Sequence, residues 1–294
     1  MSGSVFLTHG DCALELRPEI GGSVARFTWR GRDVLWPSAA DATHPFDMAC
    51  FPLVPFANRI AGGAFTFEGK RVQLPHTDGR LPHALHGDGW LVPWQVTSSS
   101  EDRAALRFEH RAAEWPWRYA AEQSFKLAED ALIISLAATN LAADAMPVSA
   151  GFHPYFPRTQ DTRFRAAVGG VWLVNASLIP SLHVPQQDLY DISDAMVGTA
   201  PFVDNCYTGF TGAAWIEMPE HDLAVALNAS EHLRFLHVYL PTEESYFCAE
   251  PVSAMPDAFN RPEPHSKTGL RVLAPGDTLT VSMQLRVGNL QHRG

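Results

Sequence analysis

Two titratable side chains in apolar surroundings are the residues best suited to chemistry in this sequence. His153 lies in the stretch AGFHPYFPR, among aromatic residues and prolines, and Glu250 lies in CAEP, directly before a proline. An imidazole titrates near neutral pH, and burial among apolar groups raises the pKa of a carboxyl group. The pair could therefore supply a proton donor and a proton acceptor. The alternative is structural, with His153 packed in the core and Glu250 bonded to backbone amides at a strand end.

A histidine pair offers a second kind of chemistry. The stretch PHALHGDGW contains His83 and His86, followed by Asp88. On a strand, residues three apart point to opposite faces, so the two imidazoles could share a metal ion only from a turn or a helix. We favour hydrogen bonding of a polar ligand by at least one imidazole, with a metal site and a structural role as alternatives. Trp90 offers a flat apolar face of the kind that covers the C–H surface of a sugar.

An arginine and an aspartate suit the same kind of ligand. Arg59 lies in ANRIAGG and Asp204 in VDNCY. A guanidinium has five fixed donors and a carboxylate only accepts, so both are good partners for vicinal hydroxyls. Each alone could equally be a structural ion pair or an exposed charge. The sequence has no GxSxG elbow, P-loop or GxGxxG fingerprint, so nucleotide chemistry has no support.

The elements that must position these groups follow a period of two. Residues 278–287, TLTVSMQLRV, alternate between polar and apolar, which predicts a half-buried strand. The turn signal APGD precedes this run, and we expect GLRVL, residues 269–273, to be its partner strand. Further short runs are ALRFEHRA, ALIISLAATNL, DLAVALNA and HLRFLHVYL. Many short strands between turn residues indicate an antiparallel all-β protein.

Other segments have a specific expected structure. AFTFEGKRVQL predicts two short strands around Gly69-Lys70. RAAEWPWRYAAEQSF has Pro116 in its middle, which a helix interior tolerates badly, so we expect two strands around a turn. Three stretches are expected to be loops and strand ends that carry function: FPLVPFANRIAGG, LPHALHGDGW and ESYFCAEPVSAMPDAFN. The fold class that follows is all-β, a large antiparallel sandwich in one domain over residues 1–294.

Composition and charge restrict the partners. The chain has 294 residues and a formal net charge of −10. Nucleic acids and anionic membrane surfaces attract clustered Lys and Arg, so this balance argues against both as partners. Cys12, Cys50, Cys206 and Cys248 are too scattered for a disulfide framework. The first residues, MSGSVFLTHGDCALEL, lack signal-peptide features and no segment is apolar enough to span a bilayer, so we expect a cytoplasmic protein.

Five motifs together resemble the aldose 1-epimerase (mutarotase) family. The run FPLVPFANRIAGGAFTFEGKRVQLP is similar to that family's N-R-I-x-x-G-x-F-x-F-x-G segment, and HALHGDGW to its leucine-histidine-glycine motif. GFHPYF is similar to its second histidine motif, VDNCYTGF to its aspartate motif, and AEPVSAMPDAFN to its glutamate motif. The five occur in the family's order. They span roughly residues 51–260, which is most of the chain.

The resemblance implies a fold, a reaction and a set of roles. The fold is an antiparallel β-supersandwich of the galactose mutarotase-like kind, with a site for a monosaccharide on one face and no metal or cofactor. By position, His153 matches the general acid and Glu250 the general base. His86 matches a histidine that binds and polarises the sugar, whereas Arg59 and Asp204 match residues that hold its hydroxyls. The sequence leaves open whether the protein is a monomer or a homodimer.

The chemistry of that reaction fits the two titratable groups. To interconvert α and β anomers, a base takes the proton of the C1 hydroxyl and an acid protonates the ring oxygen. The ring opens, the aldehyde turns, and the reverse steps close the ring on its other face. We expect the two groups on two sides of one pyranose, with a nearby carboxylate favouring the protonated form of His153. We also expect Phe152, Pro154, Tyr155 and Phe156 to hold the imidazole still.

Departures from the family pattern leave three alternatives open. Asn205 stands where many relatives have a histidine, and the compact link PHTDGRLPHALHG leaves the preferred sugar open. One alternative is a non-catalytic sugar-binding module on the same scaffold. Another is a cupin-like metal enzyme that uses His83, His86 and His153. The third is an epimerase of a phosphorylated sugar, which would need a cationic pocket.

Overall fold

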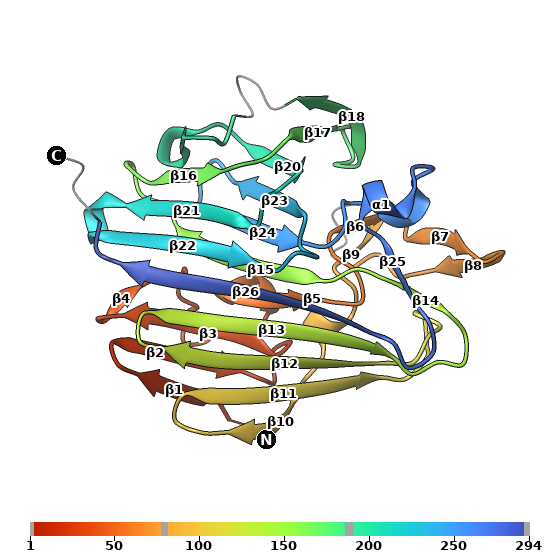
Figure 1. Cartoon of the computed structure of the whole chain (residues 1–294), viewed down its shortest axis with the longest axis horizontal. Helices are drawn as coiled ribbons and strands as arrows, with labels where there is room; N and C mark the ends of the chain where they lie inside the picture. The colour runs from red at the N-terminus through yellow and green to blue at the C-terminus, as the bar shows by residue number, and fades with distance from the viewer. Residues whose placement is uncertain (1–2, 78–81, 186–190, 291–294) are drawn as a thin grey trace.

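The computed structural model describes residues 3–77, 82–185 and 191–290, and most of its regular structure is β-strand (Figure 1). Eleven described strands form one antiparallel sheet in the order β1-β2-β3-β5-β15-β24-β23-β20-β17-β18, with β4 paired to β3. Their bounds are β1 (Val5–His9), β2 (Cys12–Arg17), β3 (Ser23–Trp29), β4 (Arg32–Asp33), β5 (Cys50–Leu53), β15 (Gly151–Pro157), β17 (Gly170–Val174), β18 (Pro180–Pro185), β20 (Val203–Thr208), β23 (Phe235–Leu240) and β24 (Tyr246–Val252).

A second antiparallel sheet has nine described strands in the order β10-β11-β12-β13-β26-β22-β21-β16-β19. Its strands are β10 (Gln95–Ser99), β11 (Arg103–His110), β12 (Tyr119–Ala128), β13 (Ala131–Asn140), β16 (Arg163–Ala166), β19 (Ala195–Met196), β21 (Ala213–Met218), β22 (Leu223–Ala229) and β26 (Thr278–Gly288). Three two-stranded pairs complete the strands: β6 (Arg59–Ala61) with β9 (His83–Leu85), β7 (Ala64–Phe67) with β8 (Lys70–Gln73), and β14 (Met146–Val148) with β25 (Arg271–Leu273).

The two large sheets lie one behind the other and share one apolar core (Figure 1). The alternation predicted over residues 278–287 is confirmed, because every second side chain of β26 is buried in that core. On β15 of the first sheet, Phe152 and Phe156 also enter the core, so His153 and Tyr155, which alternate with them, face the other way. The predicted fold class, an all-β antiparallel sandwich, is confirmed.

The expected partner of the last long strand is wrong. The β26 strand lies between β13 and β22, whereas β25, within GLRVL, pairs with β14. The physical reason lies in the turn between β25 and β26. The N–H groups of Asn140 and Gly276 bond the carbonyls of Asp277 and Asn140, respectively, which docks the turn on the end of β13. The two arms of the turn therefore enter different sheets.

The hairpin predicted in AFTFEGKRVQL is confirmed, with its turn one residue earlier than expected. Phe67 pairs with Lys70, so the turn residues are Glu68 and Gly69. Both have positive φ, 49° and 77°, as a two-residue type I′ hairpin requires. Glycine adopts the second of these conformations without strain, which fixes the turn at this position.

Residues 111–125 contain only the beginning of one strand, β12, instead of the two strands expected. Strand β11 ends at His110 and β12 begins at Tyr119, with an irregular loop between them. Trp115 and Trp117 in this loop are buried against Phe65 of the β7–β8 hairpin. Burial of these large rings replaces strand pairing as the stabilising interaction of the loop.

The described part of the chain contains little helix, and its cysteines are free. The described residues include one α-helix, α1 (His265–Thr268), and five 3₁₀ turns: Pro45–Asp47, Gly89–Leu91, Val197–Thr199, Pro219–His221 and Ala258–Asn260. None of these helices is long and apolar enough to cross a membrane. All four cysteines are free and buried, which confirms that they form no disulfide framework. Residues 78–81, within the link PHTDGRLPHALHG, lie outside the described residues.

Candidate active site

The candidate active site lies on the face of the first sheet that points away from the shared core. Neighbouring strands β5, β15, β24 and β23 each place one side chain in the same row across this face. Phe51 pairs with His153, and Glu250 pairs with His237. Between β15 and β24, Gly151 pairs with Val252 and Tyr155 pairs with Cys248, so His153 lies opposite Glu250. Because partners across an antiparallel pair point to the same face, these side chains form one continuous row.

A second row lies two residues along each strand, on the same face. Cys248 pairs with Tyr155 on one side and with Tyr239 on the other. Tyr239 is in turn the partner of Asp204. Strand side chains repeat every second residue, so this row lies beside the first. The register of the central strands therefore brings together groups that are far apart in the sequence.

A cavity of about 520 Å³ opens onto the two rows. Small-molecule sites are typically about 300–1,000 Å³, so its size suits a small ligand. All five residues predicted from the sequence line it: Arg59, His86, His153, Asp204 and Glu250. The other described residues of the lining are Phe46, Asp47, Asn58, Leu85, Tyr155, Leu178, Phe202, His237, Tyr239, Glu244 and Tyr246.

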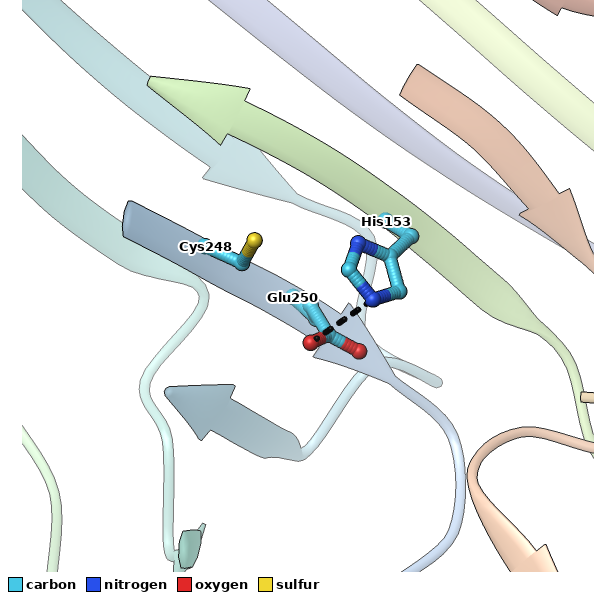
Figure 2. A group of neighbouring side chains, drawn as sticks. All are labelled: His153, Cys248 and Glu250. Carbon is cyan, nitrogen blue, oxygen red and sulfur yellow. Dashed lines mark ion pairs between the residues drawn. The ribbon is translucent and has the colours of Figure 1, made fainter. Parts of the chain in front are cut away.

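His153 and Glu250 are in direct contact within this cavity. Nε2 of His153 lies 3.2 Å from Oε1 of Glu250, and both side chains are buried (Figure 2). The imidazole is stacked on Phe51 and on Tyr155, with ring centroids 4.5 and 4.8 Å apart. The expectation that Phe152 holds the ring is wrong, because Phe152 lies in the core on the opposite face. The same holds for Phe156.

Burial sets the protonation of this pair in the free protein. It lowers the pKa of His153 to about 3 and raises the pKa of Glu250 well above its usual range. The expectation that a nearby carboxylate keeps His153 protonated is therefore wrong for the free protein, because the cost of burying charge outweighs the attraction. In this state the imidazole is neutral and the carboxyl group is protonated, so the pair holds one exchangeable proton, with Nε2 and Oε1 3.2 Å apart.

His86 enters the cavity from a tight turn after β9. Its backbone has φ 60°, and the following Gly87 has φ 75°. A Cβ on Gly87 would lie 2.3 Å from the carbonyl oxygen of Val54, so only glycine fits there. The N–H of Asn58 donates to His86 Nδ1 at 3.1 Å, which leaves the proton on Nε2. Burial holds the pKa of His86 well below its usual range, so the ring is a neutral donor.

His83 and Trp90 have structural roles. His83 Nδ1 accepts from the N–H of Gly62, and its Nε2 lies 3.0 Å from the carbonyl oxygen of Ser177, so both ring nitrogens are engaged. His83 and His86 therefore share no ion, and the cupin-like alternative loses one of its three ligands. Trp90 is buried beneath Phe51 and donates its Nε1–H to a backbone carbonyl. The expectation that Trp90 covers a sugar is wrong.

Arg59 and Asp204 are bound to each other. Nη2 of Arg59 donates to Oδ2 of Asp204 at 3.0 Å, and Nη1 donates to Oδ1 at 3.3 Å. Nε2 of His237 contacts the same Oδ1 at 2.8 Å. Burial alone would raise the pKa of Asp204, but the bond from His237 and the charge of Arg59 hold it below its usual range. Asp204 is therefore an ionised acceptor at the edge of the cavity.

Donors of three kinds meet where His153 contacts Glu250. Cys248 Sγ, a ring nitrogen of His153 and a carboxylate oxygen of Glu250 lie within 4.8 Å of one another (Figure 2). Zinc accepts such a set as a thiolate, an imidazole and a carboxylate. Burial raises the pKa of Cys248 well above its usual range, so the sulfur is a thiol. The imidazole and the carboxyl group of the set already contact each other.

The sequence did not point to His237, and the expected position of Glu250 is wrong. His237 lies in HLRFLHVYL, where period-two alternation between Phe235 and Tyr239 could have assigned it to the cavity face. Glu250 lies inside β24, whereas ESYFCAEPVSAMPDAFN was expected to be loop and strand end. Asn205 donates its amide to the carbonyl of Trp172 and does not line the cavity.

Comparisons with known proteins agree with this architecture. The family model described as aldose 1-epimerase matches residues 5–286. A curated relative, the uncharacterized protein YphB of Escherichia coli K12, is 35% identical over 290 residues, covering 96% of this chain and 97% of the relative. A crystal structure described as that of a candidate aldose 1-epimerase from Escherichia coli K12 superposes with a TM-score of 0.89 and 32% identity, covering 98% and 99% of the two chains.

A more distant structure shares the fold alone. It is a galactose mutarotase-like protein from Clostridium acetobutylicum, with a TM-score of 0.88 and 18% identity. The match covers 98% of this chain and 95% of that one. Because the family model spans nearly the whole sequence and the relative from Escherichia coli aligns over almost its full length, the chain belongs to the aldose 1-epimerase family.

Proposed function

We propose that the protein is an aldose 1-epimerase that interconverts the α and β anomers of a neutral monosaccharide. The observation that carries this proposal is the buried contact of 3.2 Å between His153 and Glu250 at the floor of a 520 Å³ cavity. Anomer exchange needs one acid and one base at neighbouring oxygens and no nucleophile or redox group. Membership of the family supports the same reaction.

The side-by-side placement of the pair suits the reacting atoms. His153 and Glu250 lie next to each other on one face, rather than on two sides of the ring as expected from the sequence. The hydroxyl oxygen on C1 and the ring oxygen are both bonded to C1, so they too are neighbours. One sugar edge can therefore present one oxygen to each group, when it inserts where Nε2 and Oε1 now meet.

The proton count of the pair fits the catalytic cycle. Glu250 as a carboxylate takes the proton of the C1 hydroxyl, and His153 as an imidazolium gives a proton to the ring oxygen while the ring C–O bond breaks. In the free protein Glu250 carries this proton and His153 is neutral, whereas in the reactive ion pair His153 carries it. The two states therefore have the same number of protons, and sugar binding requires no proton from solvent. After the aldehyde turns, the reverse transfers close the ring and restore the pair.

The remaining groups of the lining fit hydroxyls better than phosphate. Nε2–H of His86 is a donor for a sugar oxygen, and Asp204 is an acceptor for hydroxyls. Among the described lining residues, Arg59 is the only Lys or Arg, and its charge is paired with Asp204. Asp47 and Glu244 add negative charge to the cavity. A phosphorylated sugar would therefore be repelled.

Polarimetry on a series of pure α-aldoses, with and without the protein, tests the proposal directly. We expect rotation to reach its equilibrium value faster with the protein for at least one neutral hexose or pentose. Sugar binding without faster mutarotation would indicate the non-catalytic module. A preference for a sugar phosphate would contradict the substrate class. A stoichiometric transition metal that is lost together with activity would contradict the metal-free mechanism.

The pH dependence of the reaction follows from the buried pair. Because the pKa of His153 is lowered to about 3, we expect kcat/KM to stay constant from about pH 7 to about pH 5, across the usual imidazole pKa of about 6.5. The acid limb begins only when the pair takes a second proton. Activity falls again at high pH, when the pair loses its one proton and no acid remains. Polarimetric rates, corrected for the uncatalysed reaction at each pH, measure the profile.

An alternative origin of any acid limb is another imidazole in the cavity. Measurement of the same profile with the His237→Gln variant separates the two. A tenfold fall between about pH 7 and about pH 5 that persists in this variant would mean that His153 titrates near its ordinary value, which would contradict the assignment.

Removal of Arg59 is expected to weaken binding more than turnover. Arg59→Ala leaves the ionised Asp204 buried with His237 as its remaining partner, so the acceptor loses its position. We expect KM to rise by about tenfold or more with kcat changed only severalfold. The free energy of unfolding should also fall by about 3 kcal/mol, because a buried charge loses its counterion.

Arg165→Ala is a matched control for this variant. Arg165 forms an ion pair with Glu217 at the second sheet, away from the cavity, and both side chains are about a quarter exposed. We expect normal kinetics and a loss of at most about 1 kcal/mol. A fall in kcat at unchanged KM for Arg59→Ala would instead assign Arg59 to the transition state.

A further inference from the structure

The geometry points to His237 as a further sugar-binding residue that selects the substrate. We infer that its Nδ1 accepts a hydrogen bond from one hydroxyl of the sugar, so that a sugar without that hydroxyl is a poor substrate. This inference rests on the proposed function and adds to it a specificity determinant. The following contacts support it.

His237 is built into the row that carries the catalytic pair. It is the register partner of Glu250 on one side and of Cys206 on the other. Its side chain lines the cavity together with His153 and Asp204 and is 4% exposed. An imidazole at this position is next to the base and lines the same cavity.

The bond to Asp204 fixes which ring nitrogen carries the proton. Nε2 of His237 lies 2.8 Å from Oδ1 of Asp204, an oxygen that also accepts from Arg59. An ionised carboxylate only accepts hydrogen bonds, so Nε2 must be the donor. In the neutral ring Nδ1 is then a bare acceptor. Asp204 thus sets the direction of any hydrogen bond that His237 makes to the sugar.

Nδ1 of His237 is buried and has no hydrogen-bond partner among the described residues. Buried polar atoms are almost always paired, because leaving one unpaired costs stability. Nδ1 of His153 and Oε2 of Glu250, the neighbours in the row, are also unpaired within the described part of the chain. Unpaired polar atoms of this kind, grouped on residues that line one cavity, match a ligand rich in hydroxyl groups, which both donate and accept hydrogen bonds.

Two substitutions separate a sugar contact from a purely structural role. In His237→Gln the amide nitrogen reaches the position of Nε2, which keeps the donor to Asp204 and removes the acceptor at the δ position. In His237→Asn the amide oxygen takes the δ position, which keeps an acceptor and removes the bond to Asp204. If His237 only held Asp204, glutamine would preserve function and asparagine would not.

Kinetic measurements with the preferred sugar and its monodeoxy analogues test for the hydrogen bond between a sugar hydroxyl and Nδ1 of His237. In the parent we expect one deoxy position to lower kcat/KM by about tenfold or more, as loss of a buried hydrogen bond does. In His237→Gln this penalty should disappear while the penalties at other positions persist, and in His237→Asn it should persist. Unchanged penalties in His237→Gln would overturn the inference, while activity of the parent would still support the proposed function.

A spectroscopic measurement leaves His237 in place and guards against a misfolded variant. The ¹⁵N resonance of Nδ1 is followed in the Glu250→Gln variant as sugar is added. We expect saturable movement from the position of a bare imidazole nitrogen toward that of a hydrogen-bonded one. No movement at saturating sugar would overturn the inference. Absence of both sugar binding and mutarotation in the parent would instead overturn the proposed function on which it rests.

Discussion

Glu250→Gln should lower kcat by at least about 10²-fold, because a positioned base typically contributes about 10²–10⁴ in rate. The amide has the size of the carboxyl group but cannot take the proton of the C1 hydroxyl. Its substitution is mild for the fold, since burial already favours the uncharged form of this side chain. We therefore expect an unfolding free energy close to that of the parent at neutral pH, and KM should change much less than kcat.

Glu244→Gln is the matched control for this variant. Glu244 also lines the cavity, but its side chain is exposed and lies outside the row of His153 and Glu250. It should retain kcat within a small factor. Polarimetry on α-glucose or α-galactose measures both variants. If Glu250→Gln relaxed either sugar at the parent's rate, the base would be another group, and the proposed mechanism would be wrong.

Much of the site could be predicted because it depends on the alternation of polar and apolar residues and on the chemical types of the side chains. Alternation predicted the strands, and it placed Glu250 on the same side of β24 as Cys248. The types of Arg59 and Asp204 indicated a ligand with hydroxyls before any contact was known. The five ordered motifs then linked these separate groups to one family. All five residues predicted for the site line the same cavity.

What the sequence did not predict depends on register between distant strands. Nothing local in GFHPYF specifies that His153 lies opposite Glu250 rather than across a ligand from it. The pairing of Arg59 with Asp204 and the contact of His237 with the same carboxylate arise from how β6, β20 and β23 converge. The lowered pKa of His153 also follows from burial in the folded protein, whereas a nearby carboxylate was expected to favour the protonated form.

His153→Asn should likewise lower kcat by at least about 10²-fold, because asparagine cannot protonate the ring oxygen. The smaller side chain leaves Phe51 and Tyr155 without their stacking partner, so some loss of stability is expected. His183→Asn is the matched control, since His183 is exposed and lies outside the cavity lining. A His153→Asn variant with the parent's kcat would remove the imidazole from the mechanism.

The double variant Glu250→Gln/His153→Asn tests whether the two groups act as one unit. If a single proton passes between Nε2 and Oε1, then loss of either group breaks the same exchange, and the second substitution costs little more. Groups that acted independently would instead give effects that multiply, with the double variant about 10⁴-fold or more below the parent. We expect the double variant to lie within about tenfold of the slower single variant. Multiplied effects would mean that each group exchanges its proton with solvent, and the shared-proton mechanism would not hold.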